Sequence, residues 1–169
     1  MGHRMNILFV CTGNTCRSPM AEHLLKKKFE ADPYESLVQV RSAGISAMQA
    51  AAASAHAIEV LKQRNIRLDS HQSTPVDARL VEWADMILTM TMSHKHILVS
   101  QYPESSGKAF ALLEYIQEDP QQMPANGWSM DVSDPYGGDR ERYEACADQL
   151  ERAIERLYVK IQEQLHRSS

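Results

Sequence analysis

Short apolar segments alternate with helical segments along this chain, and this alternation limits the possible folds more than any other feature. Strand-like composition, with apolar and β-branched residues bounded by turn residues, occurs at residues 6–10, 37–41, 85–90 and 109–113. Helical spacing or helix-forming composition occurs at residues 18–29, 47–64, 76–83 and 93–100, and from Asp139 onward. Because strands that are separated by helices pair in parallel, we expect an α/β fold with a parallel sheet. No linker or internal repeat is visible, so residues 1–169 are expected to form a single domain.

The overall composition argues against several classes of protein. Lys and Arg total 18 against 22 Asp and Glu, and no basic run is interleaved with aromatic residues, so we expect no nucleic-acid partner. No apolar segment approaches the roughly 20 residues that span a bilayer, so we expect no membrane association. Three cysteines are too few for a secreted disulfide scaffold, and we expect a cytoplasmic monomer. Residues 1–4 are interpreted as a leader, either natural or left from a vector.

The first expected strand ends at a loop with the sequence CTGNTCRS, residues 11–18. Gly13 and Asn14 tolerate positive φ angles, so the loop can curl and direct successive backbone N–H groups toward one point. Ser18 as N-cap and Pro19 at the first helical position predict that a helix begins here, and a helix N-terminus favours an anion. The guanidinium of Arg17 can grip two phosphoryl oxygens. The residues expected to bind phosphate are Thr12, Gly13, Asn14, Thr15, Cys16, Arg17 and Ser18.

Cys11 is the expected nucleophile of this loop. Helix N-termini and nearby cations lower a thiol pKa from about 8.5, which favours a thiolate that attacks phosphorus and forms a phosphocysteine. The Ser18 hydroxyl can donate a hydrogen bond to that thiolate. A long polar loop is expected at residues 117–138, and it ends in the sequence DPYGG. Asp134 is the expected general acid and base, and Tyr136 the expected aromatic wall of the substrate site.

CTGNTCRS after a first strand and DPYGG before a terminal helix together resemble the low-molecular-weight protein-tyrosine-phosphatase family, and the resemblance covers nearly the whole chain. It implies a four-stranded parallel sheet in the order 2-1-3-4, with helices on both faces. It also implies that Cys11, Arg17 and Asp134 are catalytic. Residues that support the loop in this family correspond to Asn14, Ser18, Ser42 and His71. No metal and no cofactor is implied.

Thr15 indicates which branch of the family the chain is similar to. Tyrosine phosphatases of this family mostly carry a bulky aliphatic residue there, whereas threonine is similar to the bacterial protein-arginine phosphatases. The Thr15 hydroxyl can accept a hydrogen bond from a guanidinium, and the ring of Tyr136 can stack on its plane. We therefore expect phosphorylated proteins as partners and phosphoarginine as the substrate group. Hydrolysis of phosphotyrosine is the alternative.

The second cysteine of the loop has two interpretations, and two other functions are weakened by residues that the chain has or lacks. Cys16 is either a small core residue or the partner of Cys11 in a reversible disulfide. A thioredoxin-coupled arsenate reductase requires a cysteine pair near residues 80–95, where this chain has none, and phosphocarrier modules lack the equivalents of Arg17 and Asp134. His94 and His96 are expected on the solvated surface. Cys146 is expected to pack in the core.

Overall fold

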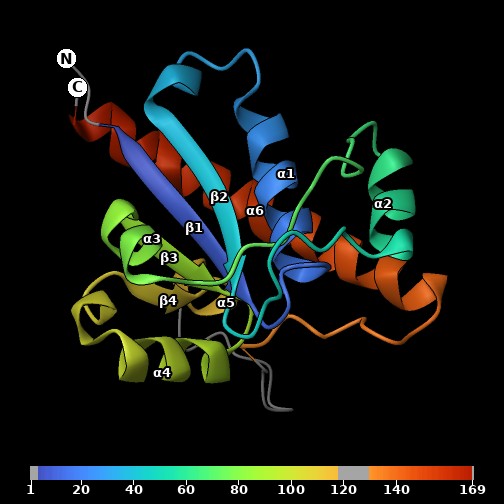
Figure 1. Cartoon of the computed structure of the whole chain (residues 1–169). Coiled ribbons are helices and arrows are strands. Elements are labelled where there is room, and N and C mark those ends of the chain that lie inside the picture. Colours follow the sequence, from blue (N-terminus) through green and yellow to red (C-terminus); the bar gives the residue numbers. More distant parts are fainter. Residues whose placement is uncertain (1–3, 118–129, 169) are drawn as a thin grey trace, which may run out of the picture.

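The computed structural model describes residues 4–117 and 130–168, so most of the expected leader and part of the expected 117–138 loop lie outside the described residues. Four parallel strands form one sheet in the order β2-β1-β3-β4, which confirms the expected order (Figure 1). The strands are β1 Met5–Cys11, β2 Val38–Gly44, β3 Met86–Thr89 and β4 Ala109–Ala111. β1 is central and the phosphate-loop sequence follows its carboxyl end, which is where parallel sheets bind ligands.

Helices cover both faces of the sheet, as expected (Figure 1). Ile7 and Phe9 of β1 pack on one face, in the larger core, with α1 (Arg17–Phe29), α2 (Ala55–Lys62) and α6 (Arg140–Ser168). Leu8 and Val10 point to the other face, in a smaller core with α3 (Ala78–Trp83) and α4 (Met92–Gln101). This alternation is the period of a strand that is buried on both faces. The remaining short helices are η1 Glu35–Leu37, η2 Pro103–Ser105 and α5 Leu112–Tyr115.

The helix predicted over residues 47–64 is wrong in its first half, because only Ala55–Lys62 is helical. The backbone N–H of Ala50 donates to the Ser73 carbonyl, and that of Ala51 donates to the Ser73 hydroxyl, each at 2.8 Å. These long-range hydrogen bonds override the helix propensity of the alanines. The strand predicted over residues 109–113 is likewise too long, since Leu112 begins α5.

The start of α1 also differs from the prediction. The helix begins at Arg17, the N-cap is Cys16, and no described side chain donates or accepts a cap hydrogen bond there. Ser18 is therefore inside the helix and is not the N-cap, and Pro19 is the third helical residue. None of the described helices combines the length and apolar character that a membrane crossing requires.

Candidate active site

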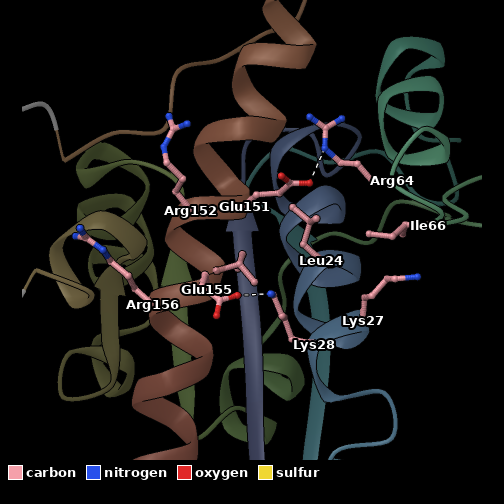
Figure 2. A pocket seen from close by; sticks show the side chains of 10 residues that line it. Leu24, Lys27, Lys28, Arg64, Ile66, Glu151, Arg152, Glu155 and Arg156 are labelled. Carbon is pink, nitrogen blue, oxygen red and sulfur yellow. Dashed lines mark hydrogen bonds and ion pairs between the residues drawn. The ribbon is translucent and has the colours of Figure 1, made fainter.

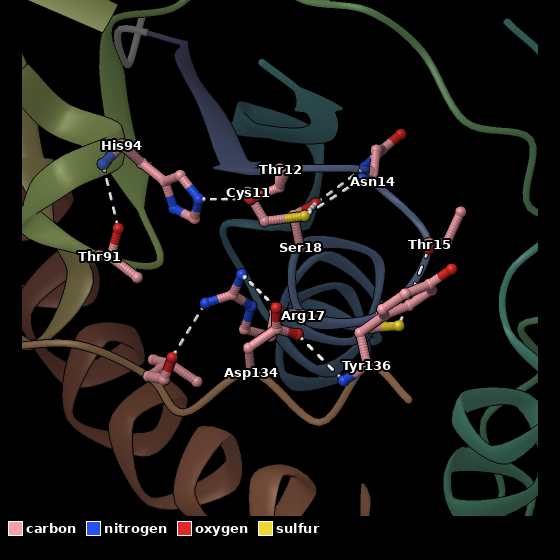
Figure 3. Close-up of polar contacts among 12 residues, drawn as sticks. Cys11, Thr12, Asn14, Thr15, Arg17, Ser18, Thr91, His94, Asp134 and Tyr136 are labelled. Carbon is pink, nitrogen blue, oxygen red and sulfur yellow. Dashed lines mark hydrogen bonds and ion pairs between the residues drawn. The ribbon is translucent and has the colours of Figure 1, made fainter. Parts of the chain in front are cut away.

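The candidate nucleophile Cys11 is the last residue of β1, and its side chain is almost fully buried. Its sulfur accepts a hydrogen bond from the backbone N–H of Asn14 at 3.2 Å and lies 2.8 Å from the hydroxyl of Ser18 (Figure 3). The loop between β1 and α1 thus curls back over the sulfur. That conformation requires Asn14 to adopt a φ of 56°, in the left-handed region that asparagine tolerates better than most residues.

The buried side chain of Asn14 holds the loop in this shape. Its amide nitrogen donates to the hydroxyls of Ser18 and Ser42, each at 2.9 Å, and its amide oxygen accepts from the backbone N–H of Thr74 at 2.9 Å. Its backbone carbonyl lies 2.8 Å from Nε2 of His71. Because the carbonyl can only accept, His71 is the donor in this contact. The structure thus brings together the four residues that the family resemblance implied as loop supports.

Donor and acceptor roles follow along this network. Asn14 donates to the Ser18 hydroxyl oxygen, so the proton of Ser18 is free to point at the sulfur of Cys11. Ser42 accepts from the same amide and donates to Oε1 of Glu22 at 2.5 Å. Glu22 is buried, and its second oxygen pairs with Lys26. Sequence analysis missed Glu22, although a carboxylate four residues after Ser18 on the inner face of a helix is a usable signal.

Two opposing influences act on the candidate nucleophile. Burial is the larger, and it raises the pKa of the Cys11 thiol above its ordinary value. Hydrogen bonds from Ser18 and from the backbone N–H of Asn14, together with the charge of Arg17, lower that pKa. The N-terminus of α1 acts in the same direction as these contacts, because its free N–H groups favour a thiolate.

Gly44 allows the loop to lie against β2. A Cβ atom built on Gly44 would lie 2.5 Å from the Thr12 carbonyl oxygen and 2.9 Å from the Asn14 nitrogen. A Cβ atom does not come this close to backbone atoms, so any larger residue must displace the loop. The residues after Gly44 then fasten it, since Ile45 and Ser46 donate backbone hydrogen bonds to the carbonyls of Cys11 and Thr12, each at 2.9 Å.

Arg17 and Asp134 meet at the entrance to the loop. The guanidinium of Arg17 is buried, donates to the Val132 carbonyl at 3.0 Å, and lies 3.5 Å from Oδ2 of Asp134. About half of the Asp134 side chain is exposed, and its other oxygen accepts from the backbone N–H of Tyr136 at 3.0 Å. Figure 3 shows Arg17 and Asp134 on the same side of Cys11. A phosphoryl group over the sulfur would therefore meet both a cation and a carboxyl group.

A cavity of about 330 Å³ lies over the loop. Its lining residues are Cys11, Thr12, Gly13, Thr15, Cys16, Arg17, Ser46, Met48, Ala51, Asp134 and Tyr136. Thr15 and Tyr136, the two expected specificity residues, thus face the same space as the candidate nucleophile, and the Tyr136 ring is largely exposed. Cys16 is reduced in this structure and buried, with its sulfur 3.3 Å from the Ser54 hydroxyl and 3.4 Å from that of Tyr143.

Comparison with known proteins identifies the family. Residues 6–167 match the low molecular weight phosphotyrosine protein phosphatase family. The chain belongs to this family. It is 41% identical to a protein-arginine-phosphatase of Geobacillus stearothermophilus, over 92% of this chain and 95% of that protein, and 42% identical to one of Bacillus subtilis (strain 168), over 90% and 94%. A solved YwlE arginine phosphatase from Geobacillus stearothermophilus superposes with a TM-score of 0.84 at 39% identity, covering 98% of this chain and 97% of that one. The protein is therefore a cysteine-dependent protein phosphatase.

His94 corrects one prediction about this phosphatase. It was expected on the solvated surface, but its side chain is buried and its Nε2 lies 2.8 Å from the Thr12 hydroxyl (Figure 3). Burial, and then the charge of Arg17, lowers the pKa of His94 to about 4, so the imidazole is neutral at neutral pH. His96, two residues on, is exposed as expected.

The described residues of the phosphatase include one group with metal-ligand chemistry. Ligand atoms of Glu22, His23 and His71 lie within 4.8 Å of one another. The ammonium of Lys26 already lies 2.5 Å from Oε2 of Glu22, and His71 holds the carbonyl of Asn14. These contacts fit a role in supporting the loop better than a role in binding metal.

A larger cavity, of about 650 Å³, lies along α1 and α6, away from the loop of the phosphatase (Figure 2). Leu24 and Ile66 give it an apolar floor, and ion pairs of Arg64 with Glu151 and of Lys28 with Glu155 cross its walls. No cysteine, serine or aspartate is among the described residues that line it. This cavity therefore offers nothing for phosphoryl transfer through cysteine.

Proposed function

We propose that this phosphatase hydrolyses phosphoarginine in proteins, in the cytoplasm and as a monomer. The observation that carries the substrate assignment is the presence of Thr15 and Tyr136 in the lining of the cavity over Cys11. A hydroxyl and an exposed aromatic ring suit the N–H donors and the flat face of a guanidinium. The two relatives named as protein-arginine-phosphatases support the same assignment.

In the first step, the thiolate of Cys11 attacks phosphorus while Arg17 and the N–H groups of the loop hold the phosphoryl oxygens. The bond between phosphorus and the guanidino nitrogen breaks, and Asp134 gives its proton to that nitrogen. The products are an unphosphorylated arginine residue in the protein substrate and a phosphocysteine in the enzyme. Guanidine has a conjugate-acid pKa of about 12.5–13.8, so this nitrogen leaves readily only when it is protonated.

In the second step, the Asp134 carboxylate removes a proton from water, and the water oxygen attacks the phosphorus of the phosphocysteine. The bond between phosphorus and sulfur breaks, and its electrons return to Cys11 as a thiolate. The hydroxyl of Ser18 lies 2.8 Å from that sulfur and can donate its proton to it, which would stabilise the sulfur as it leaves. Inorganic phosphate departs, and Asp134 carries the proton for the next cycle.

The assignment is tested by comparing kcat/KM for phosphoarginine and phosphotyrosine peptides of the same sequence context, with Cys11→Ser as the blank. We expect the parent to prefer phosphoarginine. Thr15→Ile should lower that preference by about tenfold or more, because it removes a hydrogen-bond acceptor and adds an apolar wall. Thr15→Ser, which keeps the hydroxyl, is the matched control and should retain the preference. If the parent prefers phosphotyrosine and Thr15→Ile leaves the ratio unchanged, the protein is a tyrosine phosphatase and Thr15 only packs the loop.

We further propose that Cys16 protects the nucleophile during oxidation. Peroxide converts the Cys11 thiolate to a sulfenic acid, and the Cys16 thiol then attacks it, so that a disulfide forms and water leaves. Cys11 and Cys16 both line the same cavity, which supports the proposal. After peroxide, dithiothreitol should restore activity to the parent but not to Cys16→Ala. Mass spectrometry should find a Cys11–Cys16 link in the oxidised parent. Equal recovery of the two proteins would exclude a protective role.

A further inference from the structure

His94 is the one buried histidine among the described residues, and its ring contacts the side chain of a phosphate-loop residue. Its Nε2 lies 2.8 Å from the hydroxyl of Thr12, while its Nδ1 has no hydrogen-bond partner in the described part of the chain. A buried polar atom without a partner costs free energy. The observed ring orientation therefore gives the Thr12 hydroxyl a hydrogen-bond partner and leaves Nδ1 of His94 without one in the described part of the chain.

Thr12 is held from two directions. On the β2 side its carbonyl accepts the backbone N–H of Ser46 at 2.9 Å and abuts Gly44. On the α4 side its hydroxyl is held by His94, although Thr12 itself is exposed to solvent. Thr12 directly follows the candidate nucleophile, so these two contacts fix the plane of the peptide groups that begin the phosphate loop.

The start of α4 also holds the segment that carries Asp134. The backbone N–H of Met92 donates to Oδ1 of Asp131 at 2.8 Å, and Val132 N–H donates to the Met90 carbonyl at 2.8 Å. His94 itself is fixed on this turn, because its backbone N–H donates to the Thr91 hydroxyl at 3.0 Å. One turn of helix thus contacts both the phosphate loop and the segment of the candidate general acid.

We propose that His94 is a positioning residue, which through Thr12 sets the phosphate loop relative to the segment bearing Asp134. The proposal rests on the proposed phosphate-binding role of residues 12–18 but is independent of the choice between phosphoarginine and phosphotyrosine. Because His94 is proposed to orient the loop, its replacement should change the affinity for phosphate and the turnover of any phosphoryl substrate. His94 needs no contact with the substrate to act in this way.

Replacement of His94 by two amides of different length tests the proposal. A glutamine amide reaches the position of Nε2, whereas an asparagine amide reaches only that of Nδ1. With p-nitrophenyl phosphate as substrate and inorganic phosphate as competitive inhibitor, His94→Asn should raise the inhibition constant for phosphate and KM by about three- to tenfold, the range expected for one hydrogen bond. His94→Gln should stay within about twofold of the parent, as should His96→Gln, the control on the exposed side of the same helix.

A double-mutant cycle with Thr12 separates positioning from simple stability. Thr12→Val should raise the inhibition constant as His94→Asn does, Thr12→Ser, which keeps the hydroxyl, should raise it less, and the double variant His94→Asn/Thr12→Val should be no worse than either single one. Thr12→Val and Thr12→Ser leave the buried histidine in place, so the test stands even if His94 variants fold poorly. Additive effects, equal behaviour of the Gln and Asn variants, or an unchanged inhibition constant in Thr12→Val would each overturn the proposal. Failure of the p-nitrophenyl phosphate assay in the parent would instead contradict the proposed function.

Discussion

Asn14 illustrates how much of the loop depends on one residue. Its side chain contacts Ser18 of α1, Ser42 of β2 and the backbone of Thr74, and its carbonyl contacts His71. Only asparagine combines two amide donors, an acceptor and tolerance of a positive φ in so small a side chain. Aspartate keeps the shape but has no donor, so it would leave both serine hydroxyls without their donor.

The contact between Ser18 and Cys11 predicts a change in thiol reactivity. Ser18 lowers the pKa of the Cys11 thiol, so its removal in Ser18→Ala should raise that pKa and leave less thiolate at pH 7. The rate of alkylation by iodoacetamide, measured from pH 5 to 10, should therefore rise at a higher pH than in the parent. Ser100→Ala, on the exposed surface of α4, is the control. A midpoint that does not move would show that Ser18 does not stabilise the thiolate.

Among the elements, the junction of β2 with the phosphate loop gives the sharpest prediction. Gly44→Ala places a methyl group in the space of the Thr12 carbonyl and should displace the loop. A displacement of about 1 Å near the reacting atoms lowers kcat/KM by about a hundredfold. Gly107→Ala is the matched control, because a Cβ on Gly107 meets nothing within 4 Å. The measurement is kcat/KM of the two variants by steady-state kinetics. Equal values would contradict the conclusion that Gly44 has no room for a side chain.

The elements also show which features a sequence can predict. Strands 6–10 and 85–90 were found within about two residues because their apolar runs are local signals. The alanines of residues 47–54 predict a helix, but hydrogen bonds with Ser73 and a bridge to Gln72, both distant in the sequence, hold this segment in another conformation. The burial of His94 has the same kind of cause, since His94 and Thr12 are 82 positions apart. The phosphate-loop motif is recognisable because its residue types follow one another in the sequence, whereas Ser42, His71 and Thr74, which hold it in shape, lie far away along the chain.

At the scale of the whole molecule, Arg64 joins α2 to α6. After the end of α2, its guanidinium contacts Glu151 at 2.6 Å, Asp148 at 2.7 Å and Glu144 at 3.3 Å, and also donates to the Val60 carbonyl. α6 packs directly on α1. The cluster therefore holds the helical layer together at a distance from the phosphate loop.

Loss of this cluster should affect stability and leave activity intact. Arg64→Met should lower the free energy of unfolding by about 1 to 2 kcal/mol, because the acidic partners are about half exposed and solvent weakens each pair. That corresponds to a fall in Tm of roughly 2–8 °C. Arg67→Met is the control, since Arg67 is mostly exposed and pairs with its neighbour Asp69. Thermal unfolding and kcat/KM together check the result, and a large loss of activity at full stability would argue against it.

The first turn of α1 lacks a side-chain cap among the described residues, and this links ligand binding at the loop to the stability of the folded protein. Backbone N–H groups at a helix start need an acceptor, and a phosphoryl group bound by the loop as proposed would supply one. Substrate, phosphocysteine and inorganic phosphate would each complete the helix. Because a ligand that binds only the folded state stabilises it, by about 2.7 kcal/mol at a hundred times its Kd, inorganic phosphate in that excess would stabilise the folded enzyme as well as inhibit it.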